Sequence, residues 1–247
     1  GESDVKVEDS TAEVPFLHLT LEIPHKPLFK DTEKGGLNIP QEDLLELLKK
    51  FDGSRFYDTP DRDGHLTKKQ YRLRSLPEYL VVHLSRFKKN QFGATEKNPT
   101  IVTFPVDGLN LSDFVDFADG GRRGAPTEPE VAAMSAAELS SLAKKLGLPA
   151  SQTSGVEKSD LAASCLSSLR SQPLSYNLQS SVSHASPSSV GVTSVDHLQS
   201  GSHRVHLRHD ASMQWFEVDD ERVKTTMPQL VALTEGVVLV FKRRAES

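Results

Sequence analysis

The sequence has little cysteine and no long apolar run. Cys165 is the only cysteine among 247 residues, which excludes an internal disulfide framework and a cysteine-based zinc site. No stretch of about 20 apolar residues occurs, so we expect no membrane-spanning helix and no membrane partner. Hydrophobic residues make up 36% of the chain, a low fraction for a folded domain, and the deficit lies in a serine- and alanine-rich middle part. The chain is still long enough to bury a core.

The charge balance limits the partners. A net charge of −5 argues against a nucleic-acid surface spread over the whole molecule, but it leaves room for a local basic patch. The run Lys242-Arg243-Arg244 near the end of the chain is predicted to be a basic tail that contacts RNA or acidic protein, or that serves as a solubilising end.

Hydrophobic periodicity predicts several elements. Apolar residues at every second position predict strands over residues 16–24, 79–87 and 237–241. Apolar residues at helical spacing predict helices over residues 40–51 and 109–117. Residues 52–65 are rich in aspartate and glycine and are predicted to form a solvated acidic loop.

The most informative stretch is a hairpin over residues 201–220. Arg204 and His206 alternate with Val205 and Leu207, a turn follows at residues 211–213, and a second strand is predicted over residues 214–218. Such a hairpin ending in acidic residues can place a histidine and a carboxylate across from one another. That pair is the supporting half of a Cys-His-Asp site, in which the carboxylate orients the imidazole and the imidazole activates a thiol.

This hairpin, together with the blocks at residues 76–87 and 237–243, resembles the ubiquitin-specific protease family of deubiquitinases. In active members a Gly-His-Tyr tripeptide opens the first strand, and its histidine is the general base. The aligned tripeptide here is Gly201-Ser202-His203, so Ser202 stands where the base should be. The third triad residue falls four positions after Trp215, at Asp219, and is kept. Serine has no nitrogen that titrates near neutral pH, so no catalytic residue is expected, and Ser202 and Asp219 are degenerate triad positions.

One branch of the family is more similar: the inactive splicing-factor branch, the snRNP-assembly-defective proteins of the tri-snRNP. Its hallmark Glu-Lys-Asn-Pro-Thr-Ile-Val run stands here at Glu96 to Val102. The resemblance implies a non-catalytic scaffold in pre-mRNA splicing, a nuclear location and spliceosomal snRNP proteins as partners. Because the Cys-x-x-Cys pair of the fingers region is missing, it implies no zinc, and no cofactor is expected.

The resemblance also implies a fold and a domain organisation. The fold is an α+β, papain-like ubiquitin-specific-protease fold, of which this chain is the C-terminal palm and fingers portion, with a mostly antiparallel sheet and a helical insertion. The cysteine box is expected before Gly1. We expect the following parts: a disordered acidic tail (1–14), the first part of the domain (15–117), an insertion (118–174) and the C-terminal sheet (175–247).

The insertion carries two helical patterns. One is predicted over Met134 to Leu146 with a capping box from Ser135 to Glu138, and the second begins at Glu157 or Ser159. The pattern resembles a SAP-like nucleic-acid-binding motif. Two interpretations therefore stay open for residues 119–172: contact with nucleic acid, or a plain helical insertion without such a role. Cys165 falls on the apolar stripe of the second helix and is expected to be a buried, inert thiol.

Two other functions stay open. In an active cysteine deubiquitinase, with its nucleophile upstream of this chain, His203 or His206 would replace the base and Asp219 would orient it. Neighbouring strand residues point to opposite faces, so His203 would need a bulge to turn towards the position of Ser202. The other alternative is a ubiquitin-binding module without chemistry. Two further histidines are given structural places: His83 in a strand, and His184 in a turn that resembles the family's Asn-His-Ser-Gly segment.

Overall fold

The computed structural model describes residues 10–25, 29–30, 37–60, 66–115, 126–149, 155–171, 174–185 and 201–244. Most of the predicted acidic tail, residues 1–9, lies outside these parts. Among the described helices none is long and apolar enough to cross a membrane.

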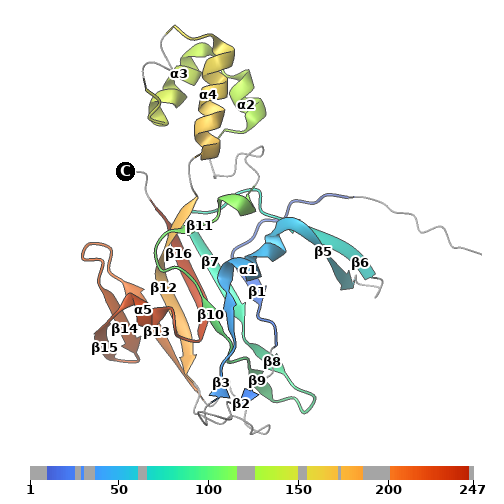
Figure 1. Cartoon of the computed structure of the whole chain (residues 1–247), viewed down its shortest axis with the longest axis vertical. Coiled ribbons are helices and arrows are strands. Elements are labelled where there is room, and N and C mark those ends of the chain that lie inside the picture. Colours follow the sequence, from blue (N-terminus) through green and yellow to red (C-terminus); the bar gives the residue numbers. More distant parts are fainter. Residues whose placement is uncertain are drawn as a thin grey trace, which may run out of the picture.

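An eight-stranded sheet organises the molecule (Figure 1). Its order is β1-β7-β16-β12-β13-β14-β15, and β11 also pairs with β12. Only the β1–β7 pair is parallel, which confirms the mostly antiparallel sheet. The bounds are β1 (Leu19–Glu22), β7 (Tyr79–Ser85), β11 (Leu109–Asn110), β12 (Ser175–Ala185), β13 (Ser202–Arg208), β14 (Trp215–Asp219), β15 (Arg222–Thr226) and β16 (Gly236–Arg243).

Four strand pairs stand outside this sheet in the described residues. They are β2 (Phe29–Lys30) with β3 (Leu37–Asn38), β4 (Gln41–Asp43) with β10 (Ile101–Thr103), β5 (Asp52–Pro60) with β6 (Leu66–Arg72), and β8 (Phe87–Lys89) with β9 (Thr95–Lys97). The predicted acidic loop at residues 52–65 is therefore wrong over β5, and residues 61–65 lie outside the described parts. Turn-forming residues concealed this strand, because pairing with β6 overrides their weak strand propensity.

The helices of the main body are short. They are α1 (Leu44–Leu48), the 3-10 turns η1 (Lys49–Phe51) and η2 (Ser112–Phe114), and α5 (Pro228–Val231). The helix predicted from residue 40 begins later because residues 41–43 pair with β10, and the Asp43 carboxylate accepts from the Leu45 N–H at 2.7 Å. The helix predicted over residues 109–117 is wrong over residues 109–115, where β11 and η2 lie, and residues 116 and 117 are outside the described parts.

One face of the sheet is covered by the core. Leu80, Val82 and Leu84 of β7 alternate onto this face and are fully buried, as the predicted strand required. Leu44 and Leu48 of α1 pack in the same cluster. The opposite face carries a row of valines in register across five strands: Val238, Val182, Val205, Val218 and Val223.

The insertion forms a separate group of helices, α2 (Glu128–Ala133), α3 (Ala136–Lys145) and α4 (Lys158–Ser171) (Figure 1). The predicted capping box is confirmed, because Ser135 and Glu138 bond each other's backbone at the start of α3. Helix α2 was not predicted; it has its own capping box from Thr127 to Glu130. The three helices bury a cluster that includes Cys165, and burial raises the pKa of that thiol, as an inert cysteine requires.

Candidate functional site

The predicted triad positions lie on two neighbouring strands of the sheet. Ser202 opens β13 and is exposed, and Asp219 is the last residue of β14. The β12–β13 register runs without a shift from the Ala185–Ser202 pair to the Ser180–Leu207 pair. Side chains therefore alternate strictly along β13, with Ser202, Arg204 and His206 on one face and His203 and Val205 on the other.

His203 lies against another histidine. Its ring centroid is 4.9 Å from that of His184, which in turn meets the ring of Phe87 edge-on at 5.1 Å. The prediction that His184 is a turn residue is wrong: His184 lies within β12, pairs with His203 of β13 and is buried. Strand β12 continues to Ala185 because β13 supplies its backbone partners.

Gly201 allows this close packing. A Cβ at Gly201 would lie 2.2 Å from Cε1 of His184 and 2.6 Å from the carbonyl oxygen of Ala185. No side chain fits at such distances, so the glycine before Ser202 is required by the His184 ring. Gly201 thus has a structural role in this chain.

Asp219 is held by an arginine. Its carboxylate accepts from Nε of Arg204 at 3.1 Å, and the same guanidinium lies 3.9 Å from Glu217. Glu217 also pairs with Lys224 at 3.0 Å and lies 3.5 Å from Nε2 of His206. We call Arg204, His206, Glu217, Asp219 and Lys224 the open network. Sequence reasoning missed the central role of Glu217, although its position two residues before Asp219 places it on the same face.

The open network shifts two pKa values. Burial lowers the pKa of His206, and the nearby Glu217 carboxylate only partly opposes this. Burial acts to raise the pKa of Glu217, but the hydrogen bond and charge of Lys224, together with His206 and Arg204, outweigh it, so the net pKa is lowered. His206 is only 2% exposed, and a neutral, enclosed imidazole presents no ring nitrogen to a substrate.

The arrangement separates the parts that base catalysis needs. His203 lies on the face opposite Asp219, and the Asp219 carboxylate is bonded to a guanidinium instead of an imidazole. An orienting carboxylate acts through a hydrogen bond to the base. The described residues around Ser202 therefore form an ion-pair network in which Asp219 is bonded to Arg204 and Glu217 is the carboxylate beside His206.

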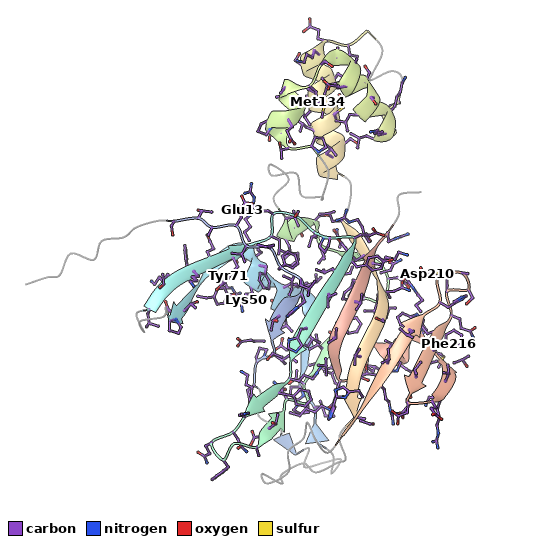
Figure 2. All side chains as sticks on the ribbon, turned by 180° about the vertical axis from the view of Figure 1, so that it is seen from behind. Glu13, Lys50, Tyr71, Met134, Asp210 and Phe216 are labelled. Carbon is purple, nitrogen blue, oxygen red and sulfur yellow. The ribbon has the colours of Figure 1, made fainter. Side chains whose placement is uncertain are left out.

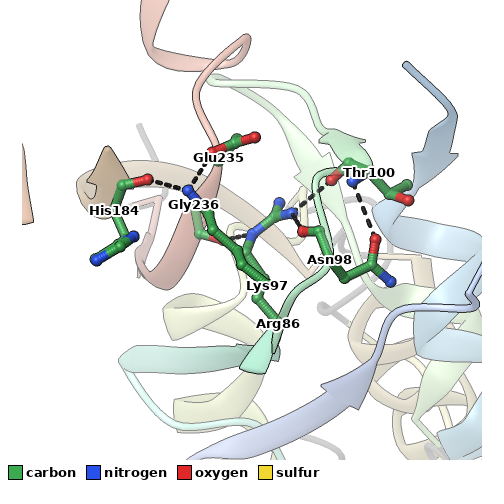
Figure 3. Close-up of polar contacts among 7 residues, drawn as sticks. All are labelled: Arg86, Lys97, Asn98, Thr100, His184, Glu235 and Gly236. Atoms are coloured by element: carbon green, nitrogen blue, oxygen red, sulfur yellow. Dashed lines mark hydrogen bonds and ion pairs between the residues drawn. The ribbon is translucent and has the colours of Figure 1, made fainter. Parts of the chain in front are cut away.

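A second polar cluster involves the block at Glu96 to Val102 (Figure 3). Arg86 is 1% exposed and donates to the carbonyl oxygens of Gly236 at 2.5 Å, Asn98 at 2.9 Å and Thr100 at 2.5 Å. Burial lowers the pKa of Arg86 to about 10, so the guanidinium stays charged at neutral pH. One cation thus connects the end of β7 to β16 and to the block.

Lys97 of the same block extends this cluster. Its ammonium donates to the backbone carbonyl of His184 and to the Glu235 carboxylate, with the lysine side chain 5% exposed. The side-chain amide of Asn98 donates to the carbonyl of Ile23 at 3.2 Å. We call Arg86, Lys97, Asn98, Thr100 and Glu235 the buried knot. Through Lys97, the buried knot holds the backbone of His184, the residue of β12 that pairs with His203.

The predicted basic tail is largely ordered. Lys242 and Arg243 belong to β16. Lys242 bonds Asp210 at 3.0 Å, and Arg243 donates to the hydroxyl of Tyr176 at 3.2 Å and to the carbonyl of Leu76. Pairing with β7 and β12 continues the sheet to these residues. The prediction of a basic tail is therefore wrong for both, and Arg244 donates its N–H to the carbonyl of Ser175.

No group of three or more His, Cys, Asp or Glu side chains able to share a metal ion occurs in the described ranges.

Comparison with known proteins shows which family this chain is similar to. A family model described as "Ubiquitin carboxyl-terminal hydrolase" matches residues 4–241. Ubiquitin carboxyl-terminal hydrolase 39 of Homo sapiens is 28% identical over 239 residues, which cover 96% of this chain and 31% of that protein. The probable mRNA-splicing protein ubp10 of Schizosaccharomyces pombe is 27% identical over 232 residues, covering 93% and 34%. The chain thus spans about a third of the length of these curated relatives.

Solved structures share the fold. The structure of the SAGA Ubp8/Sgf11/Sus1/Sgf73 DUB module matches with a TM-score of 0.55 and 18% identity, over 98% of this chain and 36% of that chain. At this identity the match concerns the fold alone, and it confirms the predicted ubiquitin-specific-protease fold. Since the family model covers nearly the whole sequence, the chain belongs to the ubiquitin carboxyl-terminal hydrolase family.

Proposed function

We propose that this chain is a non-catalytic module of the ubiquitin carboxyl-terminal hydrolase fold that acts in pre-mRNA splicing. Its role is to support assembly of the tri-snRNP and spliceosome in the nucleus through protein contacts. The name of the fission yeast relative, a probable mRNA-splicing protein, supports the process. The chain covers a third of that relative, so the role of the whole protein is part of the proposal.

The observation that carries the non-catalytic part is the pairing of Asp219 with Arg204 at 3.1 Å. In the family, this carboxylate orients a histidine at the position that Ser202 occupies here. A hydroxyl takes no proton from a thiol near neutral pH, and His203 lies on the other face of the sheet. The site keeps the acid of a triad and uses it to bind a cation.

A scaffold also needs a surface for partners, and the valine-bearing face of the sheet supplies one. Leu207 and Val223 on this face are 43% and 63% exposed, and Phe216, labelled in Figure 2, pairs with Leu207. Exposed apolar surface of this kind is typical of protein interaction sites. Strands β13 to β15 therefore present the proposed contact surface.

The test is RNA sequencing after affinity purification of the tagged, naturally full-length protein from its own cells at moderate salt. We expect enrichment of the small nuclear RNAs of the tri-snRNP, and a loss of that enrichment in Leu207→Asp. Leu17→Asp is the matched control, because Leu17 is 88% exposed and lies away from β13. Background levels of these RNAs, with ubiquitin conjugates captured instead, contradict the proposal and favour a ubiquitin-binding module.

A further inference from the structure

The β5–β6 ribbon carries a charge opposite to that of the chain. Residues 49–74 include eight basic and four acidic residues, a net of +4, whereas the whole chain has a net charge of −5. Figure 1 shows the ribbon extending away from the main sheet. Most of its described side chains are exposed, among them Arg55, Lys68 and Lys69.

One face of the ribbon combines these cations with aromatic rings. Tyr57 is directly opposite Lys69, and Tyr71 follows Lys69 by two positions, so all three side chains share a face. The rings of Tyr57 and Tyr71 are 6.2 Å apart. Nζ of Lys50 lies 5.8 Å from the Tyr71 ring centroid, and Figure 2 shows these two labelled residues side by side.

The remaining pair on this face is Thr59 with Thr67, so its paired positions carry no carboxylate. The described strands of the ribbon carry two acids on the other face: Asp52 pairs with Arg72, and Asp58 pairs with Lys68. That face also carries Phe56, which is 66% exposed. The first face thus combines Lys69 with the two tyrosine rings and has no acid among its paired positions, whereas Lys68 on the other face is opposite an acid.

We propose that this face of the β5–β6 ribbon binds single-stranded RNA. Lys50 and Lys69 contact phosphates, and the rings of Tyr57 and Tyr71 stack on bases. Proteins that bind single strands combine a positive surface along the backbone with aromatic side chains for successive bases. An acidic protein would be held by the lysines alone and would gain nothing from the two tyrosines.

Stacking and phosphate contacts suit single-stranded RNA and DNA alike, and the choice of RNA rests on the proposed splicing function. The ribbon is also a different place from the insertion, for which the sequence leaves open either nucleic-acid contact or a plain helical insertion. Within residues 126–171 of the sequence four basic residues face five acidic ones, so that segment attracts polyanions weakly.

The experiment measures fluorescence anisotropy of a labelled 12-nucleotide oligo(U) RNA titrated with the whole 247-residue chain. At moderate salt we expect a Kd of roughly micromolar order, as for non-specific binding. Tyr57→Leu should weaken binding about tenfold, since one stacking platform is lost, and Tyr57→Phe should bind normally. Lys69→Gln should lower the slope of log Kd against log salt by about 0.7, the value for one phosphate contact on a single strand.

Matched controls separate the ribbon from general polyanion binding. K88E/K89E makes a double charge reversal on the β8–β9 pair and should leave the Kd unchanged, whereas K68E/K69E should raise it strongly. Lys69 is exposed, so its variants test the proposal even if a tyrosine variant unfolds. Equal binding of Tyr57→Leu and wild type, equal binding of polyglutamate and RNA, or losses confined to K144E/K145E in the insertion overturns the proposal. This binding assay uses purified protein, so its failure is distinct from a failure of snRNA enrichment in cells.

Discussion

The buried knot and the open network use similar residues for different purposes. In the buried knot, Arg86 and Lys97 are almost fully enclosed and donate mainly to backbone carbonyls. In the open network, Arg204 and Lys224 are 42% and 68% exposed and pair with carboxylates. Removing an enclosed charged donor is costly because it leaves the buried carbonyls without a hydrogen bond. Exposed ion pairs contribute little. The comparison teaches that the block at Glu96 to Val102 holds the fold, while Asp219 contributes little to stability.

Replacing Arg86 should have the largest effect on stability. Arg86→Met removes the donor for three carbonyls, at Asn98, Thr100 and Gly236. Hydrogen bonds from charged groups are worth about 1.5–3 kcal/mol each, so we expect a loss of at least ~3 kcal/mol in the free energy of unfolding by urea. Arg55→Met is the matched control on an exposed arginine and should change it by less than ~0.5 kcal/mol. Equal effects would remove the distinction between the two clusters.

Gly201 packs against His184, whose backbone carbonyl is bonded to Lys97 of the buried knot, and its replacement should rank second. Gly201→Ala places a Cβ 2.2 Å from the His184 ring. The ring must then move, and with it the end of β12, where Lys97 bonds the carbonyl of His184. Overpacking of this kind costs about 1–3 kcal/mol, measured as a lower midpoint in urea. Ser202→Ala, one residue along and exposed, should unfold like the wild type. An unchanged midpoint for Gly201→Ala would mean that the His184 ring is not packed as described.

The open network should make stability depend on pH through His206. Burial lowers the pKa of His206 in the folded state, so the folded protein favours the neutral ring. In the unfolded chain a histidine has a pKa of about 6.5. The stabilisation is present above the unfolded pKa and is lost as pH falls below it. Unfolding measured from pH 7.5 to 5.5 should show this loss, and His206→Gln should reduce its slope.

The other groups facing His206 bear on this test. Glu217 attracts a proton to the ring, and Arg204 and Lys224 oppose it. His83 contributes a loss in the same direction, because burial and the nearby His18 lower its pKa. His83→Gln therefore serves as the comparison variant. A stability that rises as pH falls from 7.5 to 5.5 would contradict a neutral, buried His206.

The smallest effect concerns Asp219 itself. In a double-mutant cycle, Arg204→Ala and Asp219→Ala should show a coupling of about 0.3–0.5 kcal/mol, as expected for a half-exposed ion pair. His203→Ala and Asp219→Ala should be additive, because their side chains lie on opposite faces. Coupling between His203 and Asp219 that exceeds the arginine pair would show that the alternative base contacts the acid.

The sequence predicts the main sheet well because its strands have two unlike faces. Alternating Leu80, Val82 and Leu84 identified β7, and the same reasoning found the β13–β14 hairpin. Strand β5 was missed because aspartate, glycine and proline favour turns, and only its pairing with β6 makes a strand. The open network was partly predictable, since Arg204 belongs to a predicted strand and Asp219 directly follows another, but the register between the two strands was not predictable.

The buried knot was not predictable from local pattern. Arg86 and Gly236 are 150 residues apart in sequence. Every residue has a backbone carbonyl, so the amino-acid type at a position does not reveal which carbonyl accepts the hydrogen bond. The block at Glu96 to Val102 was recognised by resemblance alone, and the structure supplies the reason for Lys97 and Asn98. The resemblance places His184 in the family's Asn-His-Ser-Gly turn, whereas pairing with β13 continues β12 through this residue.

The most direct test of the central claim is hydrolysis of ubiquitin bearing a fluorophore at its C-terminus by the naturally full-length protein, purified from its own cells. We predict a rate equal to that of buffer, with no change in His203→Ala, because Asp219 is bonded to Arg204 and no imidazole occupies the position of Ser202. A rate above buffer that disappears in His203→Ala would contradict the non-catalytic account and establish His203 as the base.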